Sequence, residues 1–133
     1  MAEFEGRARE IFAEGKNYAV LSIPRKDGTV QSVVVWANVE GDALAVNSAE
    51  GRSWPANLRA AKTATVTAFA DGNPYEWASV TGSLALDTHD GADAHIDALA
   101  NKYIGQDYPY REPGEQRVKF TLAPERVTYV KQG

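Results

Sequence analysis

The chain has no cysteine among its 133 residues. Disulfides, zinc–thiolate sites, iron–sulfur clusters and thiol nucleophiles are therefore excluded. No window approaches the ~20 consecutive apolar residues that a membrane-spanning helix requires. The first five residues, Met1 to Glu5, are acidic and lack the apolar core of a signal peptide. A cytoplasmic protein without a membrane partner is therefore expected.

Several signatures of binding and catalysis are also missing. The net charge is −4, and no basic run is present, so no nucleic-acid partner is predicted. The sequence contains no GxGxxG, Walker, GxSxG or HExxH motif. His89, Asp93 and Asp97 share one face of a predicted helix, but a solvated acidic first turn explains them better than a metal site does. No metal site is predicted and no catalytic residue is assigned, so a cofactor is expected to carry any reaction.

The sequence is rich instead in short β-prone runs joined by turns. Its 44% hydrophobic and 24% charged residues are typical of a globular chain, and residues 1–133 are expected to form one domain. Helices are predicted over 3–14, 53–61 and 90–104. Hairpin links exclude a doubly wound parallel sheet and favour a mainly β fold, a small barrel of six to seven antiparallel strands with peripheral helices. The predicted strands cover residues 18–23, 30–39, 43–46, 63–69, 75–86, 116–122 and 126–130.

Three strand features carry more specific predictions. The continuous apolar run 33–37 predicts that strand 30–39 lies centrally in the sheet, with Trp36 in the core. Gly82, inside a long strand, predicts a bulge or a close backbone approach. Pro124 is predicted to break the last strand.

The segment 47–59 combines a strand end, a turn at Gly51 and a predicted helix start near Ser53. A helix start offers unpaired N–H groups and the positive end of the helix dipole. Arg52 adds a planar charged group beside them. The segment is interpreted as a phosphate-binding turn, and an ordinary capped connector is the alternative.

Two tryptophans lie in less obvious places than Trp36. Trp54 falls in the first turn of the helix that follows Arg52, where a core position is harder to assume. Trp77 begins a long strand after a turn, so it is predicted to cover a flat ring or to contact a partner subunit.

The order of motifs resembles the pyridoxamine 5'-phosphate oxidase-like split β-barrels. More narrowly, it resembles the flavin/deazaflavin-dependent oxidoreductases, in the branch that often uses coenzyme F420. The motifs follow one another in the family's order over nearly the whole chain. They are the hairpin of residues 18–36, Gly51-Arg52 with Asn57-Leu58-Arg59, the hairpin segment 74–82, the helix and loop of 99–109, and the terminal strand segment 124–127.

The resemblance implies a homodimer with two cofactor sites at its interface. It places the cofactor ring against the strand segment that contains Val33, Val34, Val35 and Trp36. It places the cofactor phosphate near Asn47, Ser48, Arg52, Ser53 and Asn57. The partner subunit would contribute the segment around Trp77 and Ala78. Trp54 departs from the family, because many deazaflavin-binding relatives have a lysine there, and it is therefore expected to influence which cofactor is held.

The predicted function is an oxidoreductase in which reduced F420 passes a hydride to a small electron-poor organic substrate, such as an enone or a quinone. Two alternatives remain open. One is an FMN-dependent oxidase or reductase on the same fold. The other is a non-catalytic carrier of a flavin or deazaflavin.

Overall fold

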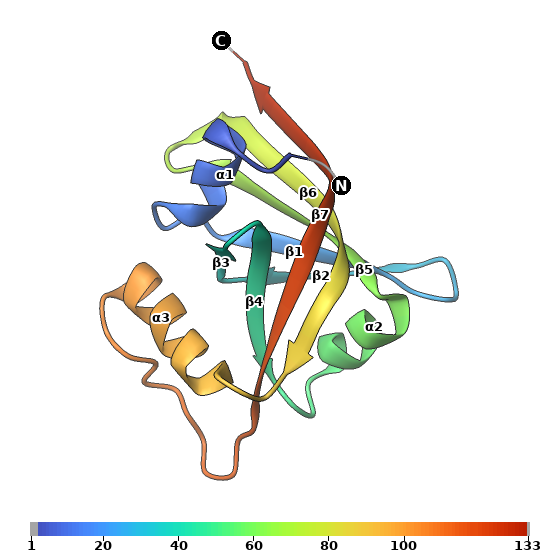
Figure 1. The fold of residues 1–133 in the computed structure, drawn as a ribbon, viewed down its shortest axis with the longest axis vertical. Coiled ribbons are helices and arrows are strands. Elements are labelled where there is room, and N and C mark those ends of the chain that lie inside the picture. The colour runs from blue at the N-terminus through green and yellow to red at the C-terminus, as the bar shows by residue number, and fades with distance from the viewer. Residues whose placement is uncertain (1–2, 133) are drawn as a thin grey trace.

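A seven-stranded antiparallel sheet dominates the computed structural model, which describes residues 3–132 (Figure 1). Three helices lie around it: α1 (Gly6–Ala13), α2 (Ser53–Ala61) and α3 (Ala92–Ile104). The strands are β1 (Ala19–Pro24), β2 (Val30–Val35), β3 (Ala37–Glu40), β4 (Ala43–Ala49), β5 (Thr63–Ala70), β6 (Asn73–Thr88) and β7 (Arg117–Lys131). Within residues 3–132, no helix combines the length and the apolarity needed to cross a bilayer.

The sheet has the strand order β2-β1-β5-β6-β7-β4-β3 and curls around one core. β2 and β3 follow each other in the chain with only Trp36 between them, yet they form the two edges of the sheet. Among the described residues no strand pairing joins these edges, so the barrel is split at Trp36. The predicted mainly β fold of six to seven antiparallel strands with peripheral helices is confirmed.

Alternation of side chains along the strands builds the core. In β5, Ala64, Val66, Ala68 and Ala70 point inward, and the residues between them point outward. This period of two is the pattern expected of a sheet with one buried face. The apolar side of α1 closes one end of the barrel, where Phe12 is almost fully buried.

Two features of the predicted strand 30–39 are wrong. The segment forms two strands, because the chain turns at Trp36 from one sheet edge to the other. β2 is an edge strand, and Val34 on its outward face is 70% exposed. The apolar run predicted that other parts of the protein cover both faces of this strand. Among the described residues of one chain, nothing covers the outward face of β2. Trp36 is only partly buried, so the prediction that it belongs to the core is also wrong.

The predicted bulge at Gly82 is confirmed, because the β6–β7 register shifts between Thr81 and Gly82. A Cβ atom on Gly82 would lie 2.7 Å from the Ala123 carbonyl oxygen, so the close backbone approach is also present. The predicted break at Pro124 is wrong. β7 continues through Pro124, which faces Gly82 at the irregular position of the ladder. A regular ladder would require an N–H at this position, which proline lacks, and the bulge removes that requirement.

Candidate functional site

A cavity of about 290 Å³ lies at the split in the barrel, between the end of β2, the start of α2, α3 and the loop that precedes β7. This is the lower end of the size range of small-molecule pockets. It is lined by Tyr18, Val34, Val35, Trp36, Asn47, Arg52, Trp54, Ile96, Leu99, Tyr108, Tyr110 and Arg117.

Aromatic rings form much of the cavity wall. The Trp36 ring stacks on Tyr103 of α3, with centroids 5.4 Å apart and planes only 7° apart. Tyr108 meets the edge of Trp36 at 6.2 Å, and Tyr110 meets Tyr108 at 5.6 Å. Tyr103 donates a hydrogen bond to the Asn17 carbonyl, which anchors the stack. A wall of flat rings fixed by packing suits a flat, unsaturated ligand.

Two arginines give the cavity a positive end. Arg52 precedes α2, and its side chain is 51% exposed. Arg117 begins β7, and its side chain is only 3% exposed. The two come together because β7 pairs with β4, the strand that leads into the turn before α2. A buried arginine requires hydrogen-bonding partners to offset its lost hydration.

A buried polar chain holds Arg117 in place. Its Nε donates to the Asn47 side-chain oxygen at 3.0 Å, and this fixes the orientation of the Asn47 amide. The Asn47 nitrogen then donates to the Ala92 carbonyl and to His95 Nδ1, each at 3.0 Å. His95 therefore carries its proton on Nε2, which donates to the Asn38 side-chain oxygen. Burial lowers the His95 pKa to about 4, which outweighs the opposing effect of nearby Glu40.

The start of α2 offers backbone N–H groups to a ligand. Gly51 has a φ of +94°, which lets the chain turn sharply between β4 and α2. Arg52 occupies the N-cap position, and its side chain makes no capping hydrogen bond. The first N–H groups of the helix thus lack the side-chain acceptor that usually caps them.

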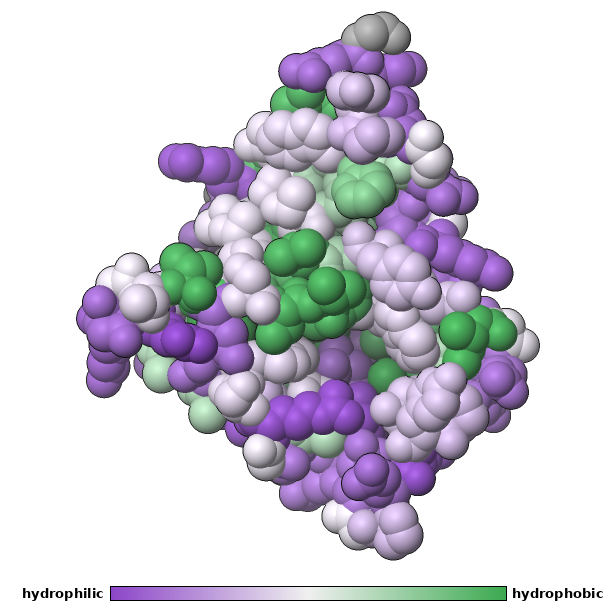
Figure 2. All heavy atoms as spheres, turned by 180° about the vertical axis from the view of Figure 1, so that it is seen from behind, coloured by the Kyte–Doolittle hydropathy of each residue, from purple (hydrophilic) through white to green (hydrophobic). Residues whose placement is uncertain are grey.

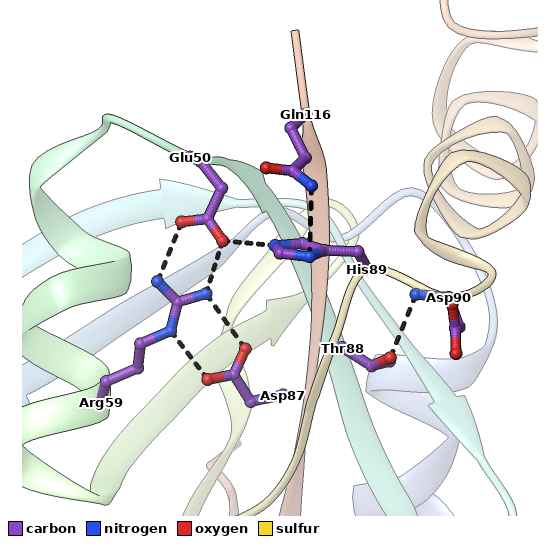
Figure 3. A network of polar contacts seen from close by, with 7 residues as sticks. All are labelled: Glu50, Arg59, Asp87, Thr88, His89, Asp90 and Gln116. Atoms are coloured by element: carbon purple, nitrogen blue, oxygen red, sulfur yellow. Dashed lines mark hydrogen bonds and ion pairs between the residues drawn. The ribbon is translucent and has the colours of Figure 1, made fainter.

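Salt bridges behind the turn fix it to the sheet. Arg59 of α2 donates to both oxygens of Glu50 and to both oxygens of Asp87, at distances of 2.7–3.0 Å (Figure 3). His89 contacts the same Glu50 carboxylate at 2.5 Å. The Arg59 guanidinium and then His89 lower the Glu50 pKa to about 2. Glu50 belongs to the turn, so these contacts determine where Arg52 lies.

His89 lies before α3 begins, so it does not share a helix face with Asp93 and Asp97 as the sequence pattern predicted. His89 pairs with Glu50, whereas Asp97 pairs with Arg111. Within residues 3–132, no group of three or more histidine, aspartate or glutamate side chains gathers closely enough to bind a metal ion.

The structure brings six of the twelve predicted cofactor-binding residues to the cavity: Val34, Val35, Trp36, Asn47, Arg52 and Trp54. Trp54 also packs into the core against Phe120, a position that the sequence made harder to assume. The Asn47 amide makes hydrogen bonds with Ala92, His95 and Arg117, so its role is to support Arg117.

The other six predicted residues lie outside the cavity. Val33 packs against the core, and Ser48 is fully buried with no hydrogen-bond partner for its hydroxyl. Ser53 and Asn57 both bond to Gln31, which ties α2 to β2. Trp77 and Ala78 lie on β6, away from the cavity lining.

Six cavity residues were not among the predicted cofactor-binding residues: Tyr18, Ile96, Leu99, Tyr108, Tyr110 and Arg117. Ile96 and Leu99 were expected on the buried face of the third helix. The apolar pattern of a helix shows that a face is buried, but it does not show whether that face packs against the core or lines a cavity. The alternation of residues 117–122 does not single out Arg117, which falls at one of its polar positions. Its position beside Asn47 depends on the pairing of β7 with β4, which local sequence does not encode.

Comparison with known proteins supports the fold. No protein-family model and no curated protein matches the sequence. An F420 reductase structure is 24% identical and has a TM-score of 0.79, over 93% of this chain and 98% of its own. An FAD-binding protein from Mesorhizobium loti is 18% identical, with a TM-score of 0.68 over 95% of this chain and 93% of its own. A candidate pyridoxamine 5'-phosphate oxidase from Listeria innocua is 14% identical, with a TM-score of 0.65 over 86% and 89%. The chain thus has the pyridoxamine 5'-phosphate oxidase-like split β-barrel fold that the sequence predicts.

Proposed function

We propose that the protein is an oxidoreductase that binds coenzyme F420 in the cavity at the barrel split. Reduced F420 would pass a hydride to a small electron-poor organic molecule such as an enone or a quinone. The observation that carries this proposal is the pairing of flat aromatic walls with two arginines at one end of the same cavity. The likeness in fold to an F420 reductase and to an FAD-binding protein supports a cofactor of the flavin type.

The donor set fits such a cofactor. Val34, Val35 and Trp36 would hold the ring, since they form the edge of the split. Arg52 and the uncapped first turn of α2 would hold the phosphate through charge and N–H groups. Ser53 and Asn57 already bond to Gln31, so their role is to fix α2 beside β2. The cofactor supplies the hydride, and the residues of this chain position it and keep water away.

A second copy of the chain would complete the site. The outward face of β1, β2, β5, β6 and β7 is nearly uncharged, and we call it the outer face. The strand register aligns its side chains in three rows. They are Val34, Val20, Thr67, Ser79 and Thr128, then Ser32, Ser22, Thr65, Thr81 and Arg126, then Phe69, Trp77 and Val130.

The outer face has the properties of an interface between subunits. Green and pale spheres gather over the middle of the molecule in Figure 2, and purple spheres lie below them and at the margins. Val34 belongs both to the outer face and to the cavity lining, so a partner seated there would cover the cofactor. Trp77 lies on this face and is the residue that a partner could bring to the ring. Ala78 is fully buried in its own chain and is left out of the proposed site.

Binding titrations test the cofactor. Purified protein is mixed with F420 and, separately, with FMN, and quenching of tryptophan fluorescence is followed. Saturable quenching by F420 supports the proposal, whereas quenching by FMN alone supports the FMN-dependent alternative. If neither ligand quenches, the assignment of a flavin-type cofactor is wrong.

Two further measurements test the reaction and the phosphate site. Oxidation of reduced F420 by a panel of enones and quinones is expected, and binding without any oxidation would support the carrier alternative. Arg52→Ala should weaken F420 binding about tenfold or more. Among the described residues, the half-exposed Arg52 side chain makes one ion pair, at 3.8 Å with Glu115, so the fold should tolerate this change. Unchanged affinity would remove Arg52 from the phosphate site.

A further inference from the structure

The two cavity arginines share one carboxylate. Glu115 Oε1 lies 2.9 Å from Arg117 Nη1, which donates a hydrogen bond to it, and 3.8 Å from Arg52 Nη2. The Glu115 side chain is only 12% exposed. Its other oxygen, Oε2, is buried and accepts no hydrogen bond from any described residue. A buried carboxylate with one unpaired oxygen exerts a strong electrostatic effect on nearby charges.

Arg117 makes hydrogen bonds to neighbouring side chains with part of its guanidinium, and its remaining N–H groups have no partner among the described residues. Its Nε donates to Asn47 and its Nη1 to Glu115, while Nη2 donates no hydrogen bond within residues 3–132. The guanidinium lies over the Tyr108 ring, with its carbon 5.0 Å from the centroid. Arg117 lines the cavity, so its remaining N–H groups are available to a ligand there.

The charges at this end of the cavity can be counted. Arg52 and Arg117 contribute two positive charges, and Glu115 contributes one negative charge, which leaves one positive charge. Glu50 lines an adjoining hollow, where Arg59 bridges it to Asp87, so these three groups together leave one negative charge that lowers the positive balance. Glu112 lines the same adjoining hollow, but it is exposed and makes no ion pair among the described residues. Its screened charge lowers the positive balance further.

We infer that this trio of Arg52, Glu115 and Arg117 is an anion site that prefers a singly charged phosphodiester to a doubly charged phosphate monoester. The inference rests on the proposed function and deepens it. F420 carries its ring-side phosphate as a diester, whereas the FMN phosphate is a monoester with a charge of −1.5 to −2 near neutral pH. Glu115 repels the second negative charge of the monoester and does not repel a diester as strongly. Glu115 is thus a specificity-determining residue for the cofactor.

The test compares two matched variants. Glu115→Gln keeps the shape of the side chain and an oxygen that can accept from Arg117, but removes the charge. Glu112→Gln removes the same charge from the same loop at an exposed position with no arginine contact. Dissociation constants for F420 and FMN are measured by fluorescence quenching for the wild type and both variants. Thermal unfolding curves establish that each variant is folded.

The wild type should bind F420 more tightly than FMN. Glu115→Gln should shift the ratio of the two dissociation constants about tenfold toward FMN, and Glu112→Gln should shift it less than twofold. Arg52→Gln provides a second variant at a half-exposed position, where folding is less at risk. It should weaken both ligands and should weaken FMN more, because the monoester phosphate of FMN carries more negative charge than the diester phosphate of F420.

The other possible results distinguish a failure of this inference from a failure of the proposed function. An unchanged ratio in Glu115→Gln, or equal shifts in both glutamate variants, would overturn the inference while cofactor binding itself stands. A wild-type preference for FMN would also overturn it. If neither ligand binds to any of the proteins, the proposed function fails first and the inference falls with it. If Glu115→Gln does not fold, equal losses for both ligands in Arg52→Gln would decide against the inference.

Discussion

At the scale of single residues, His95 makes the structure sensitive to a change of pH. It is buried, and its Nδ1 must accept a hydrogen bond from Asn47. A protonated His95 would carry N–H groups on both ring nitrogens, so one N–H would face the Asn47 N–H. The same Asn47 amide holds Arg117 at the cavity. The protonation state of one histidine is thus linked to the position of a cavity arginine.

We expect His95 to make the protein less stable in mild acid. Its folded-state pKa is about 4, below the ordinary value of 6.5 that it regains on unfolding. Between these pH values the unfolded chain binds a proton that the folded chain does not, so stability is full above about pH 6.5 and falls as the pH approaches 4. The loss should reach about 3 kcal/mol. Urea unfolding at pH 7 and at pH 4.5 would measure it.

The comparison that isolates this contribution is His95→Gln, which keeps an acceptor for Asn47 and cannot titrate. Its stability should change less than that of the wild type between pH 7 and pH 4.5. The carboxylates contribute equally to both proteins, so they cancel in the difference. Parallel pH curves for the two proteins would show that His95 does not act in this way.

At the scale of elements, α2 depends on the salt bridges of Arg59 more than on its own length. The helix has nine residues, which is short for a stable isolated helix. Leu58 and Trp54 bury its inner side, and Arg59 connects its last turn to Glu50 in the turn and to Asp87 in β6. These contacts keep the start of α2 at the cavity.

Arg59→Lys should loosen α2, because an ammonium group cannot make two paired contacts at once. The Arg59, Glu50 and Asp87 side chains are each about one third exposed, so solvent screening limits the loss to about 1–2 kcal/mol. Thermal unfolding measures it, and F420 affinity should fall with it as the turn moves. Arg9→Lys is the control, since Arg9 makes one exposed hydrogen bond to the Gly41 carbonyl. Equal effects of both substitutions would contradict the assigned role of Arg59.

Local sequence predicted most elements because turns and periodicity act over a few residues. The helix predicted over 53–61 and the strand over 63–69 lie within one residue of α2 and β5. The errors at Trp36 and Pro124 arose where distant strands decide the outcome. Trp36 joins the two sheet edges, and Pro124 is accommodated by Gly82 across the ladder.

The candidate site was less predictable for the same reason. The turn at Gly51 and Arg52 has a local signature, and the structure places Arg52 at the cavity. Arg117 reaches the cavity only because β7 pairs with β4, and Glu115 joins the site through its contacts with Arg117 and Arg52. Ser53 and Asn57 were assigned to a phosphate, but their side chains bond to Gln31 of β2, and no local pattern indicates that contact.

At the scale of the whole molecule, the outer face is the feature that a single chain leaves unexplained. Edge strands exposed to water are usually short or charged, which prevents association. β2 instead presents Val30 and Val34 outward at the edge of the sheet, and Val20 of β1 lies directly beside Val34. Neighbouring hydroxyls on this face, such as Thr67 and Ser79, pair with each other, so few of them require water. A surface of this kind is typical of a subunit interface.

Val20→Glu should therefore separate the proposed dimer into monomers. Val20 lies on the outer face and does not itself line the cavity, so the sedimentation of Val20→Glu tests assembly directly. Leu86→Glu is the matched control, because Leu86 is 42% exposed against 41% for Val20 and lies near Arg59, outside the three rows of that face. Sedimentation equilibrium should give a dimer for the wild type and for Leu86→Glu, and a monomer for Val20→Glu. If the partner covers the cofactor, Val20→Glu should also weaken F420 binding. A dimer that survives Val20→Glu would place the interface elsewhere, and a wild-type monomer would mean that one chain alone forms the site.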